Sequence, residues 1–367
     1  MNIHTLSQLL HNHFDWHPAR INTLSQSILS LIITGSVTLK HLAQGFQNEA
    51  VLHSSIRRLQ RFFKEQPFDF HTFAGLIYIL SGIGKTKVCI ALDRTNWDFG
   101  IFPINFLFIT VIWGKISIPI VWSLLGKEGN SNTAERIDLV KKFLKIIPAS
   151  QILCFLGDRE FIGKEWFDFL NENKIPFAMR IKSSTKIKHS NGGSVPIKNL
   201  FYCLQIREYL QIDTKIWGIQ VQISGMKLSD GKLLIIASPQ KLTLNILEIY
   251  RERWGIERTF LCLKTKGFNF ERTHLKENDK LLKLMAIAVL AFIISVKIGE
   301  FREEEKAIPI KNHGRPLYSI FTYGLDWLRF VLLKNQRPQA LSLLKTMTQF
   351  FMGLLDTPLN LLLSLKF

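Results

Sequence analysis

Apolar residues recur at helical spacing over the first part of the chain, up to about residue 85. Residues 21–35 predict a helix that stops at Gly35, and residues 38–46 and 54–65 predict two shorter helices. We expect Ser54 or Ser55 to cap the last of these helices. That helix also carries four cations, namely Arg57, Arg58, Arg61 and Lys64.

Two short helices joined by a turn have two interpretations. They are typical of a helix-turn-helix, in which the second helix docks on DNA and its arginines contact the duplex. An ordinary helical hairpin with solvated arginines has the same pattern. The hydrophobic pattern alone leaves both open.

The hydrophobic pattern changes near residue 86, where the helical spacing ends and apolar runs typical of buried strands begin. Residues 87–92, 105–114 and 116–125 predict three strands, with a tight turn at Gly114 and Lys115. A helix, a strand over 151–157, a short helix and a fifth strand over 176–184 follow. This order, three strands and then alternating helices and strands, indicates a mixed α/β core.

The next segment, from about 182 to 239, alternates apolar and polar residues and predicts a β-rich insertion. From Arg180 to Lys232 it holds nine basic residues against three acidic ones, so it is a basic segment. Trp217 lies in it, either to stack on an extruded base or to pack in the small core of the insertion. Helices are predicted from about Leu242 to Lys264, around 284–296, and in the tail over 318–334 and 339–355.

The net charge of the chain limits the classes of binding partner. The 367 residues carry a net charge of +18, and 47% of them are hydrophobic, which indicates a globular protein with a polyanionic partner. A membrane surface is the rival to nucleic acid, but the apolar run 284–296 is shorter than the roughly 20 residues that a bilayer needs. We therefore expect a buried helix there and no membrane association. The N-terminus resembles no secretory signal, and the four cysteines form no metal or disulfide pattern, which favours the cytoplasm.

Four residues between 250 and 264 fall on one stripe of a regular helix. Tyr250, Arg253, Glu257 and Lys264 lie within about 60° of one another at roughly 100° per residue. A carboxylate flanked by cations suits a site where a metal and a phosphate backbone meet. A solvated helix face, with Arg253 and Glu257 as an i,i+4 pair, is the other interpretation.

Two aspartates accompany this stripe. Asp93 and Asp158 each follow a buried strand, where a carboxylate is costly unless it is paired, hydrogen-bonded or bound to a metal. A turn residue is the alternative for either one alone. Three carboxylates from two strands and a helix suit two Mg²⁺ ions, which prefer hard oxygen ligands.

The spacing Y-x2-R-x3-E-x6-K resembles the YREK signature of the DDE transposases of the insertion-sequence-four family, with all four positions in order. The words Asp93-Arg94-Thr95-Asn96-Trp97 and Asp158-Arg159-Glu160-Phe161 resemble the family's first motif, D-x-T with an aromatic residue, and its second, D-R-x-F.

The resemblance implies a ribonuclease-H-like mixed sheet with flanking helices, a β-rich insertion and a helical N-terminal domain. It implies that Asp93, Asp158 and Glu257 are catalytic and hold two Mg²⁺ ions, for which Mn²⁺ can substitute. It also implies that Tyr250, Arg253 and Lys264 contact DNA phosphates. Arg159 has either a phosphate role or a surface ion pair with Glu160 or another acid.

We expect a helical DNA-binding domain over 1–85 and a catalytic core over 86–184 and 241–305. The β-rich insertion over 185–240 interrupts the core, and a helical region covers 306–367. The implied function is cleavage of double-stranded DNA at terminal inverted repeats and strand transfer, by a homodimer in the bacterial cytoplasm, associated with the nucleoid. A catalytically inactive, transposase-derived DNA-binding protein or repressor is the first alternative. A ribonuclease-H-like nuclease without strand transfer is the second.

Overall fold

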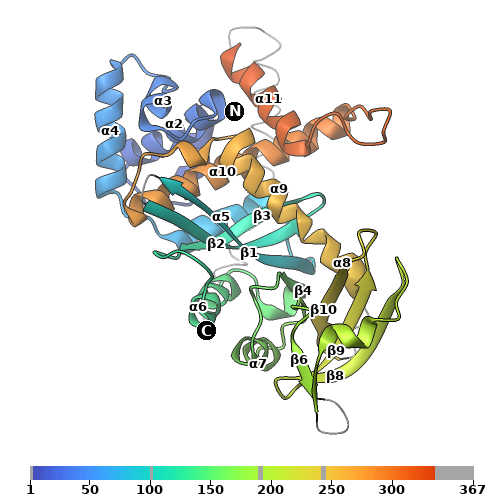
Figure 1. Ribbon diagram of the computed structural model, residues 1–367. Helices are drawn as coiled ribbons and strands as arrows, with labels where there is room; N and C mark the ends of the chain where they lie inside the picture. Colours follow the sequence, from blue (N-terminus) through green and yellow to red (C-terminus); the bar gives the residue numbers. More distant parts are fainter. Residues whose placement is uncertain (1–2, 100–101, 189–192, 241–244, 335–367) are drawn as a thin grey trace. The chain divides into compact units, whose positions relative to one another are not determined.

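The computed structural model describes residues 3–99, 102–188, 193–240 and 245–334 (Figure 1). These residues fall into two compact units. The first unit combines the residues up to Gly84, those from Trp97 to Phe102 and those from Phe260 onward. The second unit comprises Lys85–Asn96 and Pro103–Thr259. The domain division expected from the sequence stays a prediction, and the expected tail helix over 339–355 lies outside the described residues.

The first unit is helical. Its helices are α1 (Ile3–His11), α2 (Pro18–Thr34), α3 (Leu39–Gln44), α4 (Leu52–Glu65), α5 (Phe70–Ser81), α10 (Asn278–Glu305) and α11 (Ile320–Leu333). As predicted, α2 ends before Gly35, which takes a left-handed φ of 64° and donates its backbone N–H to the carbonyl of Leu31. The predicted serine cap of α4 is wrong: Val51 is its N-cap residue, and no side chain caps the helix.

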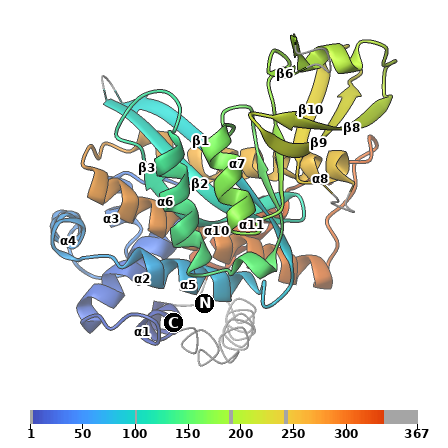
Figure 2. The same cartoon turned by 90° about the horizontal axis from the view of Figure 1, so that it is seen from below.

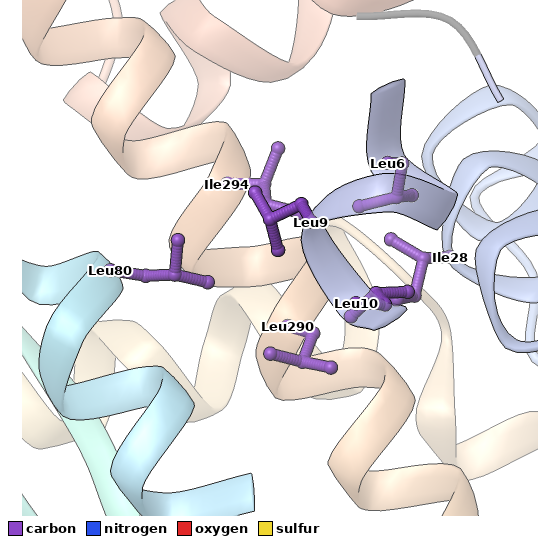
Figure 3. A pocket seen from close by; sticks show the side chains of 7 residues that line it. All are labelled: Leu6, Leu9, Leu10, Ile28, Leu80, Leu290 and Ile294. Carbon is purple, nitrogen blue, oxygen red and sulfur yellow. The ribbon is translucent and has the colours of Figure 1, made fainter. Parts of the chain in front are cut away.

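Leucine and isoleucine side chains from α1, α2, α5 and α10 meet in the core of this unit (Figure 3). They leave no space large enough for a water molecule. The apolar run that includes 284–296 is part of the 28-residue α10, which is long and apolar enough to span a membrane by length and composition alone. The argument from its shortness was therefore wrong. The most apolar window of α10 is 94% buried inside the protein, as the buried-helix interpretation expects.

An eight-stranded mixed sheet forms the centre of the second unit, in the order β3-β2-β1-β4-β5-β10-β9-β8. Strands β1 and β4 are parallel, as are β4 and β5, whereas β10 is antiparallel to β5. The bounds are β1 (Val88–Phe99), β2 (Phe102–Trp113), β3 (Ile116–Leu124), β4 (Ile152–Gly157), β5 (Phe177–Arg180), β8 (Tyr209–Ile216), β9 (Ile219–Lys227) and β10 (Leu233–Ser238).

Helices α6 (Thr133–Leu144) and α7 (Lys164–Glu172) pack against each other beside this sheet (Figure 2). A separate pair of short strands, β6 (Lys186–Lys188) and β7 (Ser194–Pro196), precedes β8. Short helical turns cover Ala149–Gln151, Ile197–Phe201 and Phe270–Arg272. The architecture confirms the mixed α/β class and is consistent with a ribonuclease-H-like fold. Because β10 pairs with β5, the basic β-rich segment extends the central sheet.

The signature segment does not form the single regular helix that the stripe assumed. Helix α8 (Ile246–Glu252) and helix α9 (Trp254–Leu261) are separated at Arg253, and residues Cys262–Lys266 form a π-helical turn. Residues 241–244, where the helix was expected to begin, lie outside the described residues. A π-turn has more residues per turn than an α-helix, so the constant 100° per residue that the predicted stripe assumes does not hold as far as Lys264.

Candidate functional site

Backbone register brings the two aspartates next to each other. The parallel pairing of β1 with β4 ends with Leu92 opposite Gly157. Asp93 is the next residue after Leu92, and Asp158 is the next residue after Gly157. Asp93 does not end its strand, as the sequence suggested, because β1 continues to Phe99. The aspartates nevertheless lie directly after the last paired residues of β1 and β4.

Glu257 reaches the same place through Arg253. One guanidinium nitrogen of Arg253 donates to Asp93 Oδ2 at 2.7 Å, and the other donates to Glu257 Oε1 at 2.8 Å. The Arg253 side chain is only 9% exposed, so this bridge is largely screened from water. Asp93 and Glu257, which are 164 positions apart in the sequence, are thus joined by one buried cation.

Close packing on β3 fixes the position of α9 in this unit. Thr259 Oγ1 donates to the carbonyl of Ser117 at 2.7 Å and accepts from the Ser117 N–H at 3.0 Å. A Cβ on Gly255 would lie 2.9 Å from the carbonyl oxygen of Ile116, so this position needs glycine for the helix to approach the strand. Glu257 lies between these two anchors.

Burial controls the charge on Asp93. Removal from water, with smaller contributions from the nearby Asp158 and Glu257 carboxylates, raises the pKa of Asp93 to about 6. Arg253 and the backbone N–H of Arg94 oppose this shift but do not cancel it. The charged form of Asp93 is therefore poorly solvated where it lies.

Three buried polar atoms in this region have no hydrogen-bond partner among the described residues. They are Asp158 Oδ1, Tyr250 Oη and Arg253 Nε. Asp158 forms an ion pair with Arg180, whose guanidinium lies 3.7 Å from Oδ1, beyond hydrogen-bonding distance. Burial also raises the pKa of Tyr250 to about 12, which keeps the phenol neutral and able to donate. Unsatisfied buried groups of this kind are uncommon and indicate a place for water, an ion or a ligand.

The donor set fits a divalent cation, because Asp158 offers a buried hard oxygen and Asp93 and Glu257 offer two more carboxylates nearby. As the side chains are arranged here, however, Arg253 occupies one oxygen of each of the latter two. Within the part of the chain that the structure describes, no three His, Cys, Asp or Glu side chains are grouped closely enough to hold one ion.

The remaining signature cation, Lys264, belongs to the first unit. Its ammonium pairs with Glu271 at 2.8 Å and lies 5.5 Å from the centre of the Trp97 ring. Arg159 is exposed, and the ion pair with Glu160 suggested as one alternative is not formed, because Glu160 pairs with Arg94 at 2.8 Å instead. The phosphate roles of these cations stay predictions.

The arginines of α4 have different environments. Arg57 and Arg61 are exposed and, with Gln60, Lys64 and Lys280, line an open hollow of about 610 Å³. Arg58 instead donates to Thr23 Oγ1 at 2.8 Å and to Asn22 Oδ1 at 2.7 Å, which ties α4 to α2. Arg58 is thus engaged within the protein, whereas Arg57 and Arg61 face solvent.

Trp217 lies at the turn of the β8–β9 hairpin. It takes a φ of 52° and is followed by Gly218 at 84°, both in the left-handed region that a tight hairpin turn requires. Its ring is 37% exposed and contacts Phe167 of α7 edge-on, with ring centroids 5.6 Å apart. The predicted packing in a core of the insertion itself is therefore not what anchors it.

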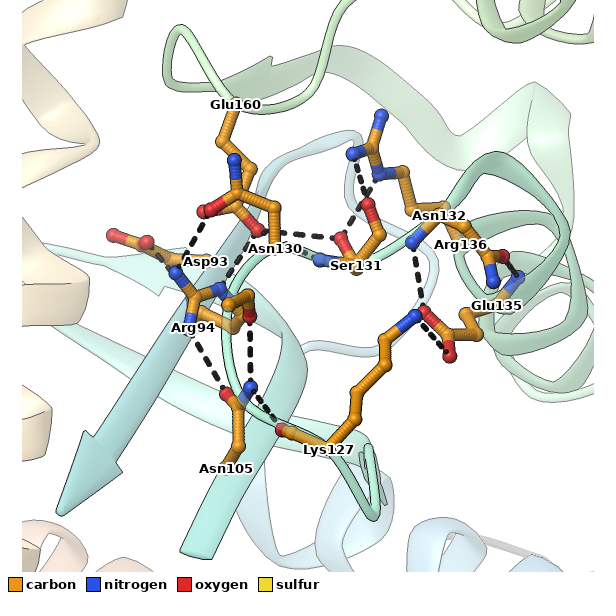
Figure 4. Close-up of polar contacts among 11 residues, drawn as sticks. Asp93, Arg94, Asn105, Lys127, Asn130, Ser131, Asn132, Glu135, Arg136 and Glu160 are labelled. Atoms are coloured by element: carbon orange, nitrogen blue, oxygen red, sulfur yellow. Dashed lines mark hydrogen bonds and ion pairs between the residues drawn. The ribbon is translucent and has the colours of Figure 1, made fainter. Parts of the chain in front are cut away.

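Sequence reasoning missed a polar network next to the acids, formed by Arg94, Asn105, Asn130, Ser131 and Glu160 (Figure 4). It also missed Arg180 as the neighbour of Asp158. The one available signal was position: Arg94 directly follows Asp93, and Glu160 follows Asp158 by two residues.

Comparison with known proteins bears on the class of this site. Residues 119–294 match the family model of the transposase DDE domain, a range that includes Asp158 and Glu257 but not Asp93. This match supports a DDE transposase. Among solved structures, the chain is similar to endonuclease V from Bacillus subtilis, with 12% identity over 53% of this chain and 91% of that chain. The TM-score of 0.27 is too low for this likeness to support any conclusion. No curated protein matches the chain.

Proposed function

We propose that the protein is the transposase of an insertion sequence of the insertion-sequence-four type. It binds the terminal inverted repeats of its element, cleaves the DNA at their ends and transfers the cleaved strand to target DNA. The observation that carries this proposal is the placement of Asp93 next to Asp158 at the end of the β1–β4 ladder, with Glu257 joined to Asp93 through Arg253. The transposase-domain match over residues 119–294 supports the same class.

Asp93, Asp158 and Glu257 would hold two Mg²⁺ ions, with Mn²⁺ as a possible substitute. In such sites, divalent ions activate the attacking hydroxyl and stabilise the leaving oxygen. Arg253 balances part of the carboxylate charge from within the site, and the unsatisfied Arg253 Nε and Tyr250 hydroxyl are donors that suit a phosphate oxygen.

The exposed cations of α4 suit the phosphate backbone of double-stranded DNA, and a homodimer would hold two transposon ends at once. Arg57 and Arg61 open onto solvent beside Lys64 and Lys280, and phosphate neutralisation by such cations supplies sequence-independent affinity. Lys264 and Arg159 would add phosphate contacts near the cleaved bond. Cleavage and joining of chromosomal DNA would take place in the cytoplasm, in association with the nucleoid.

The test compares Asp93→Asn, Asp158→Asn and Glu257→Gln with the unchanged protein on DNA that carries the element's ends and Mg²⁺. Each variant should lose cleavage and keep binding to the ends, because metal ligation is local whereas phosphate contacts are spread over many cations. Asp138→Asn is the matched control, since Asp138 is an exposed partner of Lys142 on α6. An unchanged protein that binds the ends without nicking them would indicate the repressor alternative. Nicking without joined products would indicate a nuclease.

A further inference from the structure

An ion pair joins Arg94, the residue after Asp93, to Glu160, the second residue after Asp158. Arg94 Nε donates to Glu160 Oε1 at 2.8 Å, and the two side chains are only 16% and 17% exposed (Figure 4). On both strands the pairing of β1 with β4 ends just before the aspartates. The Arg94–Glu160 pair therefore links β1 to the segment that follows β4, just beyond the last paired residues.

The Arg94 guanidinium is held on its other sides as well. One terminal nitrogen donates to Asn105 Oδ1 at 3.1 Å, and the other donates to Asn130 Oδ1 at 3.2 Å. Every guanidinium nitrogen of Arg94 thus has an acceptor from a different part of the unit, namely β2, the β3–α6 loop and the segment after β4. A planar group with three separate partners has little freedom to rotate.

Glu160 is fixed by the same loop. Its Oε1 accepts from the backbone N–H of Ser131 at 3.2 Å and from the Ser131 hydroxyl at 3.3 Å. The Asn105 amide in turn donates to the carbonyls of Lys127 and Gly129, at 3.1 and 2.9 Å. The loop before α6 is therefore tied to both members of the ion pair, and Figure 4 shows these contacts around one centre.

We propose that Arg94 and Glu160 are positioning residues that keep Asp93 and Asp158 next to each other beyond the end of the β1–β4 ladder, where their carboxylates would bind a divalent cation. This inference rests on the proposed function. The backbone N–H of Arg94 donates directly to Asp93 Oδ1 at 2.8 Å, so the clamp acts on that carboxylate through its own neighbour. Outer partners of this kind orient the groups that bind a metal, and their loss weakens metal affinity about 10- to 100-fold.

The experiment measures Mn²⁺ binding to the full-length protein without DNA, by titration calorimetry. Glu160→Gln keeps an oxygen for Ser131 but removes the charge, and we expect it to bind Mn²⁺ about 10-fold or more weakly than the unchanged protein. Asp138→Asn, which removes a carboxylate from an exposed ion pair of the same unit, should bind Mn²⁺ like the unchanged protein. Circular dichroism and the melting temperature establish that each variant is folded.

A cycle with Arg94→Gln separates positioning from general destabilisation. If the two residues act through one clamp, the double variant should lose no more Mn²⁺ affinity than the weaker-binding single variant. Rescue is a second readout: Arg94→Lys keeps the charge opposite Glu160 and should recover part of the affinity that Arg94→Gln loses. Unchanged Mn²⁺ affinity in folded Glu160→Gln, or fully additive losses in the double variant, would overturn the proposal.

A parallel titration of Asp158→Asn distinguishes this inference from the proposed function. If Asp158→Asn loses Mn²⁺ binding while Glu160→Gln retains it, the metal site stands and only the positioning role is wrong. If Asp158→Asn binds Mn²⁺ like the unchanged protein, the metal site itself is wrong and the proposed function loses its central element.

Discussion

Replacing Asp93 with asparagine should stabilise the folded protein at neutral pH, even though it removes a carboxylate from the proposed site. Asp93 Oδ2 accepts from Arg253 at 2.7 Å, yet burial and two neighbouring carboxylates raise the pKa of Asp93 from 3.8 to about 6. The attraction to Arg253 is already included in this balance. The folded protein therefore holds a proton on Asp93 at a pH where the unfolded chain has released it.

The magnitude follows from this shift. Each pKa unit corresponds to about 1.4 kcal/mol, so a rise of about two units makes an ionised Asp93 cost about 3 kcal/mol of folding free energy. For a carboxyl whose folded pKa is raised, the folded state binds more protons between the two pKa values. Its contribution to stability thus falls as pH rises from about 4 through about 6, then stays constant. Asparagine mimics the protonated side chain and avoids this loss.

Urea unfolding of the unchanged protein and of Asp93→Asn, each without divalent cations, checks this at several pH values between 4 and 8. The difference in unfolding free energy should move by about 3 kcal/mol in favour of Asp93→Asn across this range, most of it below about pH 6.5. The exposed control Asp138→Asn should differ from the unchanged protein by less than about 0.5 kcal/mol. A difference in unfolding free energy that does not depend on pH, or one that moves against Asp93→Asn between pH 4 and pH 8, would refute the reasoning. Added Mg²⁺ should stabilise the unchanged protein and leave Asp93→Asn nearly unaffected.

Three further predictions concern DNA contacts. Arg61→Ala should lower the slope of log DNA affinity against log salt by about one unit, with little change in stability. Arg58→Ala should leave this slope unchanged and cost about 1–3 kcal/mol of stability, because Arg58 is hydrogen-bonded to Thr23 and Asn22. Equal slopes for both variants would contradict this prediction. Lys264→Ala should weaken binding to the cleaved end similarly for all end sequences, and Lys264→Arg should retain part of the binding. Binding titrations over a range of salt decide, and an unchanged slope would limit Lys264 to contacts within the protein, such as the Glu271 ion pair. Trp217→Ala should lose about 1–3 kcal/mol of affinity for a DNA substrate with an unpaired base at its end. Tyr209 is an exposed aromatic residue of the same hairpin, and Tyr209→Ala should not lose this affinity. If folded Trp217→Ala completes the reaction normally, the stacking hypothesis is wrong.

The order of helices and strands could be predicted from the sequence because burial periodicity is a local property. The helix that ends at Gly35 and the strands before Asp93 and Asp158 depend on residues within a few positions of each other. The proximity of the two aspartates depends on the parallel pairing of β1 with β4, which the order of the elements alone does not give. In addition, the strand that carries Asp93 continues beyond it, because residues after 93 still adopt an extended conformation.

The partners of the cations could not be predicted, because they come from distant parts of the chain. Helical spacing assigned Arg253 to a stripe facing DNA, but two of its nitrogens bind Asp93 and Glu257. Helical spacing likewise predicted the same DNA contact for Arg58 as for Arg61, although Arg58 is hydrogen-bonded to residues 35 and 36 positions away. Nor does a residue pattern reveal a π-turn, which arises when a helix accommodates one extra residue, so the angle of Lys264 was out of reach.

The bridging position of Arg253 accounts for how one site can hold acids and a cation so close together. Three carboxylates surround a single buried guanidinium, which satisfies one oxygen of Asp93 and one of Glu257 but none of Asp158. Burial raises the pKa of Asp93, and Asp158 Oδ1 has no hydrogen bond among the described residues, with the Arg180 guanidinium 3.7 Å away. A strictly structural ion-pair network would be expected to satisfy its acids, because burying an unpaired carboxylate reduces stability. Within the part of the chain that the structure describes, the site instead leaves Asp158 Oδ1 without a hydrogen-bond donor and with only the more distant Arg180 guanidinium as an ion-pair partner, which is the arrangement expected where an additional cation is to bind.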